Sequence, residues 1–157
     1  MKTLVAYFSA TGTTERAARA LADVAGADLF EIEAAEPYTA ADLNWNNSSS
    51  RSSIEMNDDA ARPAIAQAVN NMEEYSTVFV GFPVWWYVEP RIIDTFLESY
   101  DFSGKTLIPF ATSGGSGLGE APARMAAICP DATVKRGGLL NHPSPASAEK
   151  FVNANIG

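Results

Sequence analysis

The stretch from Leu4 to Thr14 reads LVAYFSATGTT, and it decides how the chain folds. Leu4 to Phe8 is a short, nearly continuous apolar run, which is typical of a parallel strand buried on both faces. Six small or polar residues follow it: Ser9-Ala10-Thr11-Gly12-Thr13-Thr14. Beyond them, residues recur at helical spacing (Thr14, Ala17, Ala18, Leu21, Val24 and Ala25). We therefore predict a strand, a tight loop and an amphipathic helix.

The rest of the chain continues this alternation. Further strands are predicted at Asp28 to Glu33, Thr77 to Phe82, Lys105 to Ala111, and Ala132 to Lys135 resuming at Leu139-Leu140; helical patterns lie at Ile65 to Met72, Pro90 to Leu97, Leu118 to Ala126 and Ala146 to Asn155. Such alternation predicts the α/β class, as a doubly wound, five-stranded parallel sheet of order 2-1-3-4-5 in three layers. Pro109 interrupts its strand and is best placed near the strand's end.

One segment breaks the pattern. Between about residues 36 and 58 the sequence shows no sustained period and includes Ser48-Ser49-Ser50, so we expect an irregular insertion that is either functional or disordered. The length of 157 residues, with a mass of 16.7 kDa, predicts a single domain spanning residues 1–157.

The amino-acid composition limits the classes of partner and ligand that the protein can bind. A net charge of −8 repels phosphate backbones, so we expect no nucleic acid partner, whereas an acidic face can steer docking onto a basic protein.

Cys129 and His142 are the single cysteine and histidine, so no metal site is expected, and His142 is placed in a surface turn. No run approaches the roughly 20 apolar residues of a membrane span. The chain does not begin with a signal-peptide pattern, which predicts a cytoplasmic protein. The composition leaves the oligomeric state open.

Three unusual loops follow the first, third and fourth predicted strands: Ser9 to Thr14, Pro83 to Glu89, and Thr112 to Gly119. In the order 2-1-3-4-5 they are neighbours at the carboxyl edge of the sheet, where open α/β sheets bind ligands. The first loop combines hydroxyls with Gly12 and opens a helix, and it has no Lys or Arg before Arg16. This favours a phosphate held by neutral donors over a plain N-cap turn.

The other two loops predict a flat ligand. The second contains Pro83-Val84-Trp85-Trp86-Tyr87, and three consecutive aromatics cannot all point into one core. At least one is therefore expected at the surface or against a flat ring, with ordinary core packing as the alternative. The third contains Ser113-Gly114-Gly115-Ser116-Gly117, whose glycines let the backbone approach a ligand closely; a plain flexible loop is its alternative.

With these motifs the chain resembles the flavodoxin family, whose phosphate signature Thr/Ser-x-Thr-Gly-x-Thr stands intact at Ser9 to Thr14. The likeness spans almost the whole chain and points to a short-chain, bacterial branch. It implies FMN as the cofactor, with Pro83 to Tyr87 along the ribityl chain and ring and Ser113 to Gly117 at the ring's polar edge. Carrier flavodoxins usually keep an acidic, aromatic loop after strand four, and here that loop is rich in Gly and Ser.

Three functions stay open. The one we favour is an FMN-binding carrier of electrons between redox proteins, without catalytic side chains. The second is an NAD(P)H-dependent reductase of quinones or similar small acceptors, in which Tyr38, Trp45 and Arg51 close over the flavin. The third is a receiver-type signalling module, which needs an aspartate at the end of strand three, where this chain has Gly81-Phe82-Pro83.

Overall fold

The computed structural model describes residues 2–113 and 117–156. Its strands are β1 (Lys2–Tyr7), β2 (Asp28–Glu31), β3 (Tyr75–Pro83), β4 (Thr106–Thr112), β5 (Thr133–Val134) and β6 (Gly138–Leu139). Its helices are α1 (Thr13–Ala25), α2 (Arg51–Met56), α3 (Arg91–Glu98), α4 (Ala121–Ile128) and α5 (Pro145–Ile156), with a 3-10 turn, η1 (Met72–Glu74). The strands lie in the order β2-β1-β3-β4-β5, with β6 also paired to β4. The predicted doubly wound order is confirmed.

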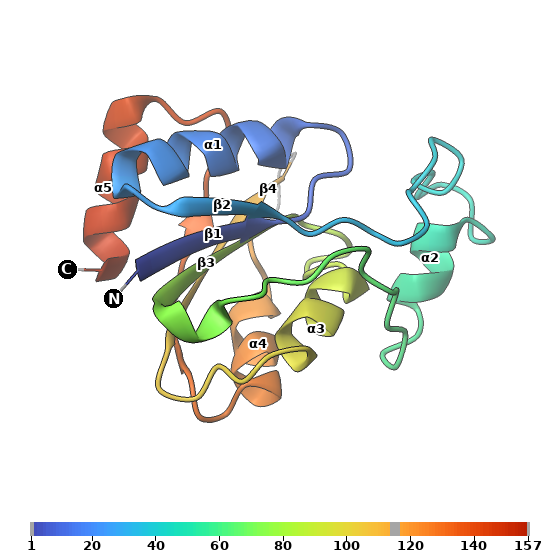
Figure 1. Ribbon diagram of the computed structural model, residues 1–157. Helices are drawn as coiled ribbons and strands as arrows, with labels where there is room; N and C mark the ends of the chain where they lie inside the picture. Colours follow the sequence, from blue (N-terminus) through green and yellow to red (C-terminus); the bar gives the residue numbers. More distant parts are fainter. Residues whose placement is uncertain (1, 114–116, 157) are drawn as a thin grey trace.

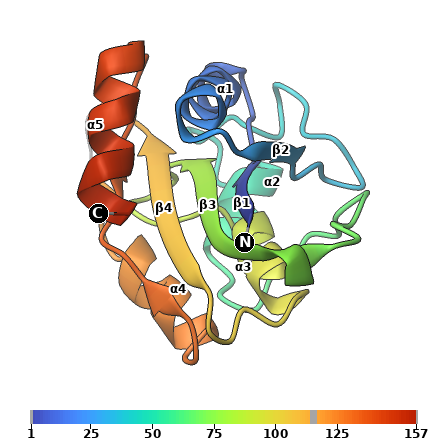
Figure 2. The ribbon, with the colours of Figure 1, turned by 60° about the vertical axis from the view of Figure 1, so that its left-hand side comes forward.

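Two helical layers cover the two faces of the sheet (Figure 1, Figure 2). α1 and α5 pack together on one face, and α3 and α4 pack together on the other. Successive residues of β1 enter different cores: Leu4 and Ala6 belong to one, and Val5 and Tyr7 to the other. The predicted burial of the first strand on both faces is confirmed. None of the helices in the described part of the chain is long and apolar enough to cross a membrane.

The fifth strand is split in two, which differs from the five-stranded sheet that we predicted. β5 and β6 pair with β4 on either side of Pro109, which lies in the middle of β4 and not near its end. The carbonyls of Leu107 and Ala111 accept hydrogen bonds from this edge, so by strand alternation Pro109 faces it too and has no N–H to donate. At the break, a Cβ on Gly137 would lie 1.8 Å from the Pro109 carbonyl oxygen.

The predicted helix over Ile65 to Met72 is wrong. Ile65 forms an antiparallel bridge with Ala34, and the N–H of Ala66 donates to the carbonyl of Glu33 at 2.8 Å. The apolar side chains of this segment still pack against the core. Their spacing matches a helix, but the backbone finds its partners in the segment after β2.

The insertion at residues 36–58 extends beyond the carboxyl ends of the strands and contains one short helix, α2 (Figure 1). Ser50 caps this helix, because its hydroxyl accepts a hydrogen bond from the N–H of Ser53 at 3.4 Å. Arg51 Nη1 donates to the carbonyl of Glu36 at 2.6 Å. This bond ties α2 back to the beginning of the insertion, so the segment that we expected to be irregular folds around a helix.

Candidate functional site

The loop between β1 and α1 is built around the hydroxyl of Ser9. Ser9 Oγ accepts hydrogen bonds from the N–H groups of Gly12 at 3.0 Å and Glu15 at 3.2 Å. Gly12 has a φ of 93°, a left-handed conformation that residues with a side chain adopt only with strain. The chain therefore turns sharply before α1, and Thr11 and Thr13 come to line a pocket.

Four backbone donors of this loop stay available to a ligand. The N–H groups of Ala10, Thr11, Thr13 and Thr14 have no acceptor within residues 2–113 and 117–156. They lie at the beginning of α1, where the helix dipole favours an anion. The loop thus offers donors without a cation, and a phosphate group fits this donor set.

Polar side chains join this loop to the ends of neighbouring strands. The hydroxyls of Thr14 and Thr112 lie 2.7 Å apart in the interior, which links α1 to β4. Asn141 makes two hydrogen bonds to Ser113: its Oδ1 accepts from the N–H at 2.9 Å, and its Nδ2 donates to the carbonyl at 3.0 Å. Because its hydroxyl is engaged inside the protein, Thr14 offers a ligand its backbone N–H instead.

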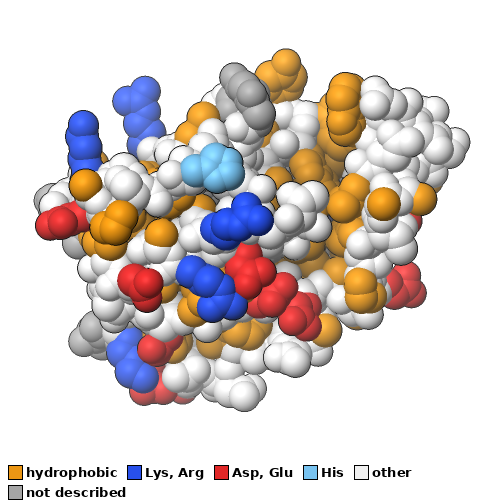
Figure 3. Space-filling model, turned by 90° about the horizontal axis from the view of Figure 1, so that it is seen from above, with side chains coloured by type: hydrophobic (Ala, Val, Ile, Leu, Met, Phe, Trp, Pro, Cys, Tyr) orange, Lys and Arg blue, Asp and Glu red, His pale blue; other side chains and the backbone are white. Residues whose placement is uncertain are grey.

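These loops surround an open pocket of about 470 Å³, which we call the strand-end pocket. Its walls are Ala10, Thr11, Thr13, Leu43, Pro83, Val84, Trp85, Thr112, Ser113, Asn141 and His142. The volume lies in the range of pockets that hold one small-molecule cofactor. Figure 3 shows this face of the molecule, where hydrophobic side chains gather in a hollow beside the protruding insertion. Parts of all three loops therefore meet here. The described residues of the pocket wall include no Asp or Glu.

The glycines predicted at the ring's polar edge are only partly described. Gly114 and Gly115 lie outside the described residues. Gly117 is exposed, and nothing else in the described chain comes within 4 Å of the position of a Cβ on it. Contacts of these glycines with a ligand stay a prediction.

The three aromatic residues after β3 have different surroundings. Hydrogen bonds of 3.0 and 3.1 Å join the N–H of Trp85 to the carbonyl of Val88 and the reverse, so residues 85–88 form a tight hairpin. Trp86 and Tyr87 at its tip have φ angles of 51° and 68°. Each such conformation costs a residue other than glycine about 1–3 kcal/mol. Trp85 lines the pocket, whereas Trp86 is 45% and Tyr87 is 69% exposed, which confirms that at least one of the three lies at the surface.

Trp85 belongs to a cluster of three rings with Phe8 and Tyr38. Its ring centroid lies 5.8 Å from that of Phe8 and 5.6 Å from that of Tyr38, both edge to face. The guanidinium of Arg51 lies 3.8 Å from the centroid of the Tyr38 ring, and Arg51 Nε is paired with Glu55 at 2.9 Å. Tyr38 and Arg51 thus join the insertion to the wall of the strand-end pocket.

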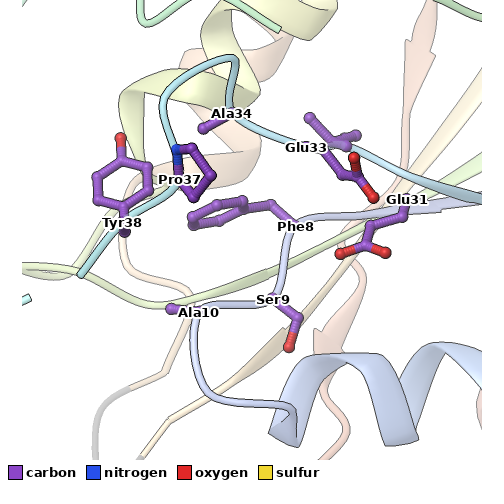
Figure 4. Close-up of a pocket in the computed structure, with 9 residues that line it drawn as sticks. Phe8, Ser9, Ala10, Glu31, Glu33, Ala34, Pro37 and Tyr38 are labelled. Atoms are coloured by element: carbon purple, nitrogen blue, oxygen red, sulfur yellow. The ribbon is translucent and has the colours of Figure 1, made fainter. Parts of the chain in front are cut away.

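A second hollow of about 350 Å³ adjoins the first, with Ala10 in both walls. Figure 4 shows the rings of Phe8 and Tyr38 on one side and the carboxylates of Glu31 and Glu33 close together on the other. Burial and the neighbouring charge of Glu33 raise the pKa of the Glu31 carboxyl. This acidic hollow repels an anion, so the strand-end pocket is the better place for a phosphate.

Three wall residues escaped the sequence analysis. Leu43 comes from the insertion, and Asn141 and His142 come from the turn between β6 and α5. His142 is exposed in a turn, as we expected, but it stands at the pocket. The sequence could have indicated the place of Asn141 and His142, because their turn follows the fifth strand and so lies at the same edge of the sheet as the other loops.

A buried charged group follows the hairpin directly. Glu89 and Asp94 are both 0% exposed, and Arg124 on α4 donates to both, to Glu89 at 3.1 Å and to Asp94 at 3.3 Å. Among the described residues, Glu89 Oε1, Asp94 Oδ1 and Arg91 Nη1 are buried and have no hydrogen-bond partner. Burial first, and then the hydrogen bond and charge of Asp94, raise the pKa of Glu89 to about 8. The buried site therefore favours the protonated form of Glu89 over the ionised form.

This proton makes stability depend on pH. Because the pKa of Glu89 rises from 4.5 to about 8 on folding, its stabilising effect is complete below pH 4.5 and is lost as the pH rises towards 8. Relative to Glu89→Gln, the free energy of unfolding of the wild type should fall by up to about 1.4 kcal/mol for each pH unit between pH 4.5 and 8. Urea unfolding between pH 5 and 9 measures the slope, with Glu149→Gln on the exposed side of α5 as the control. Equal slopes for Glu89→Gln and wild type would contradict the raised pKa of Glu89.

Fold and pocket together define a class of protein, namely an open α/β protein with a pocket at the carboxyl ends of its strands, where such sheets bind ligands. The chain belongs to the flavodoxin family, whose sequence model matches residues 2–155. This confirms the predicted family and, with it, FMN as the cofactor. The parts of FMN suit the pocket: the loop before α1 has donors for its phosphate, and Trp85 offers a surface for its ring.

Solved structures extend the comparison. A candidate flavoprotein from Bacteroides eggerthii DSM 20697 is 49% identical, with a TM-score of 0.95 over 99% of this chain and 98% of its own. Another, from Bacteroides uniformis ATCC 8492, is 48% identical, with a TM-score of 0.93 over 97% of each chain. A flavoprotein in complex with FMN from Lactobacillus acidophilus NCFM is 22% identical and shares the fold, with a TM-score of 0.71 over 96% and 97%. A comparison with curated proteins gives no match.

Proposed function

We propose that the protein holds FMN in the strand-end pocket and carries electrons between redox proteins. The observation that carries the proposal is a set of exposed aromatic side chains on two sides of the pocket. Trp86 and Tyr87 stand on the hairpin, and Trp45, which is 70% exposed, follows the wall residue Leu43 by two positions. Exposed aromatic residues are enriched where proteins dock, so a partner can reach a cofactor held between them.

In this proposal each loop has one task. Ser9 to Thr14 binds the phosphate through backbone N–H groups and the hydroxyls of Thr11 and Thr13. Pro83 to Tyr87 lies along the ribityl chain and ring, with Trp85 against the ring. The segment from Ser113 to Gly117 lies at the ring's polar edge, and the backbone N–H groups that follow Ser113 are the donors to it, since the N–H of Ser113 already donates to Asn141. FMN supplies the redox chemistry, and the chain positions it and sets its potential.

The charge of the protein supports a carrier. A net charge of −8 favours encounter with a basic partner surface and makes the association rate fall as salt screens it. The exposed aromatics beside the pocket then supply short-range contact. The partner class we infer is a redox protein with a basic rim around its own cofactor.

Anaerobic mixing of the FMN-loaded protein with NADPH or NADH tests the proposal. We expect slow loss of the flavin absorbance with either nucleotide alone. Addition of an NADPH-dependent flavoprotein reductase should accelerate this loss, and more salt should slow it. Rapid bleaching by NADPH alone would favour the reductase function instead.

The hairpin tip offers a second test. Replacing Trp86 and Tyr87 with serine should slow reduction by the protein reductase, because the docking contact is lost. Reduction by dithionite, a small reagent that needs no docking, serves as the control and should keep its wild-type rate. Unchanged rates with both reductants would contradict docking at the hairpin.

His142 favours the second candidate function, an NAD(P)H-dependent reductase of quinones or similar small acceptors. Its imidazole lines the pocket, where a ring N–H can donate a hydrogen bond to a bound acceptor. Tyr38 and Arg51 would then support a wall of the substrate site. If NADPH reduces the loaded protein, His142→Gln should lower turnover with a quinone without changing the Kd for FMN.

A further inference from the structure

The aromatic hairpin cannot hold its shape by local preference alone. Trp86 and Tyr87 are two consecutive residues with positive φ, a combination that turns of this type usually give to Gly or Asn. Their side chains are largely exposed and pack little. The conformation must therefore be held by contacts around the hairpin.

Two contacts act on the backbone at the tip. The carbonyl of Tyr87 accepts a hydrogen bond from the N–H of Glu120 at 3.3 Å. Gly119 lies so close that its Cβ, if present, would stand 2.0 Å from the same carbonyl oxygen. The segment before α4 thus supports the tip of the hairpin, and the residues that leave the hairpin towards α3 need an anchor of their own.

Glu89 is the side chain placed to be that anchor. It follows Val88, the last residue of the hairpin, and its side chain is completely buried. We propose that Glu89, held by Arg124 and Asp94, is a positioning residue that keeps the Trp85–Val88 hairpin in place and so orients Trp85 against the flavin. This inference rests on the proposed site of FMN in the strand-end pocket.

The charged groups around Glu89 explain why a carboxylic acid can anchor the hairpin. Arg124 on α4 donates to both Glu89 and Asp94, and Asp94 on α3 also lies 3.7 Å from Arg91 and 3.9 Å from Arg62. Asp59 pairs with Arg91 at 2.9 Å and lies 3.8 Å from Arg124. A neutral Glu89 can donate to Asp94 while it accepts from Arg124. An ionised Glu89 keeps its ion pair with Arg124 but repels Asp94 and cannot donate to it, so the anchor weakens as the acid loses its proton.

Two variants separate anchoring from simple stability. Glu89→Ala removes the anchor, and we expect a shifted flavin absorption band and a Kd for FMN raised about tenfold, since Trp85 is no longer held in its binding position. Glu89→Gln keeps the shape and the donor of the neutral acid. It should restore the band and the Kd at pH 7, and it should remove the rise in Kd that we expect for the wild type between pH 7 and 9. Glu149→Gln is the matched control.

Fluorescence titration of the apoprotein with FMN gives the Kd, and the spectrum of the same samples gives the band. A wild-type Kd and band in Glu89→Ala, or the same pH profile in wild type and Glu89→Gln, would overturn the inference. Lower thermal stability without a change in Kd or band would overturn it as well, because Glu89 would then only stabilise the fold. Failure of the site itself looks different, since Thr11→Val and Thr13→Val would then leave the Kd for FMN unchanged.

Discussion

Replacing Gly12 with valine should raise the Kd for FMN by about 100-fold or more. Gly12 has a φ of 93°, between the donors of Thr11 and Thr13, and a β-branched residue cannot adopt this conformation without strain. The loop must rearrange, and its N–H groups then turn away from the phosphate. Two lost hydrogen bonds to a charged group correspond to about 3–6 kcal/mol. Titration of the apoprotein with FMN, followed by flavin fluorescence, measures the change.

Gly26 provides the matched control at the other end of α1. It also has a positive φ, 63°, and nothing lies within 4 Å of the position of its Cβ. Gly26→Val introduces the same kind of backbone strain far from the pocket, so it should lower stability and leave the Kd for FMN unchanged. If the two variants lose affinity equally, or if Gly12→Val binds as the wild type does, the phosphate does not bind in this loop.

Replacing Gly81 with alanine should destabilise the protein by about 3 kcal/mol. Gly81 lies in β3, and a Cβ there would come within 2.2 Å of Phe110 Cζ and 2.5 Å of its Cε2. Phe110 is completely buried in β4, so its ring has no free space to enter. For a protein of this size the melting temperature should fall by about 6–12 °C. Urea unfolding gives the change in free energy.

Gly138 is the matched control, because a glycine-to-alanine substitution there adds a methyl group without a clash. A Cβ on Gly138 would lie 3.5 Å from the ring of Phe151, which is an ordinary contact distance, so Gly138→Ala should change stability little. In the Gly81→Ala background, Phe110→Leu should restore part of the lost stability because the smaller side chain leaves room for the methyl group. Equal effects of the two alanine substitutions would contradict the packing argument.

The elements that sequence patterns predicted well are those whose signals are local. The apolar run of β1, the turn at Gly12 and the stripe of α1 follow one another, and each depends on residues a few positions away. The helix predicted over Ile65 to Met72 was wrong because apolar spacing alone cannot distinguish a helix from an irregular segment that packs the same side chains inward. The backbone partner that decided it, Glu33, lies about thirty residues earlier.

The amino-acid sequence by itself predicted the α/β class, the strand order and the tight turn before α1, because these follow from the alternation of strand and helix patterns along the chain and from a motif in consecutive residues. Only the tertiary structure decided the place of Pro109 in the middle of β4, the presence of Leu43 and His142 in the pocket wall, and the burial of Glu89 beside Asp94 and Arg124. Each of these depends on distances between residues far apart in the chain. Burial and electrostatic coupling arise from that proximity, and no local pattern records it.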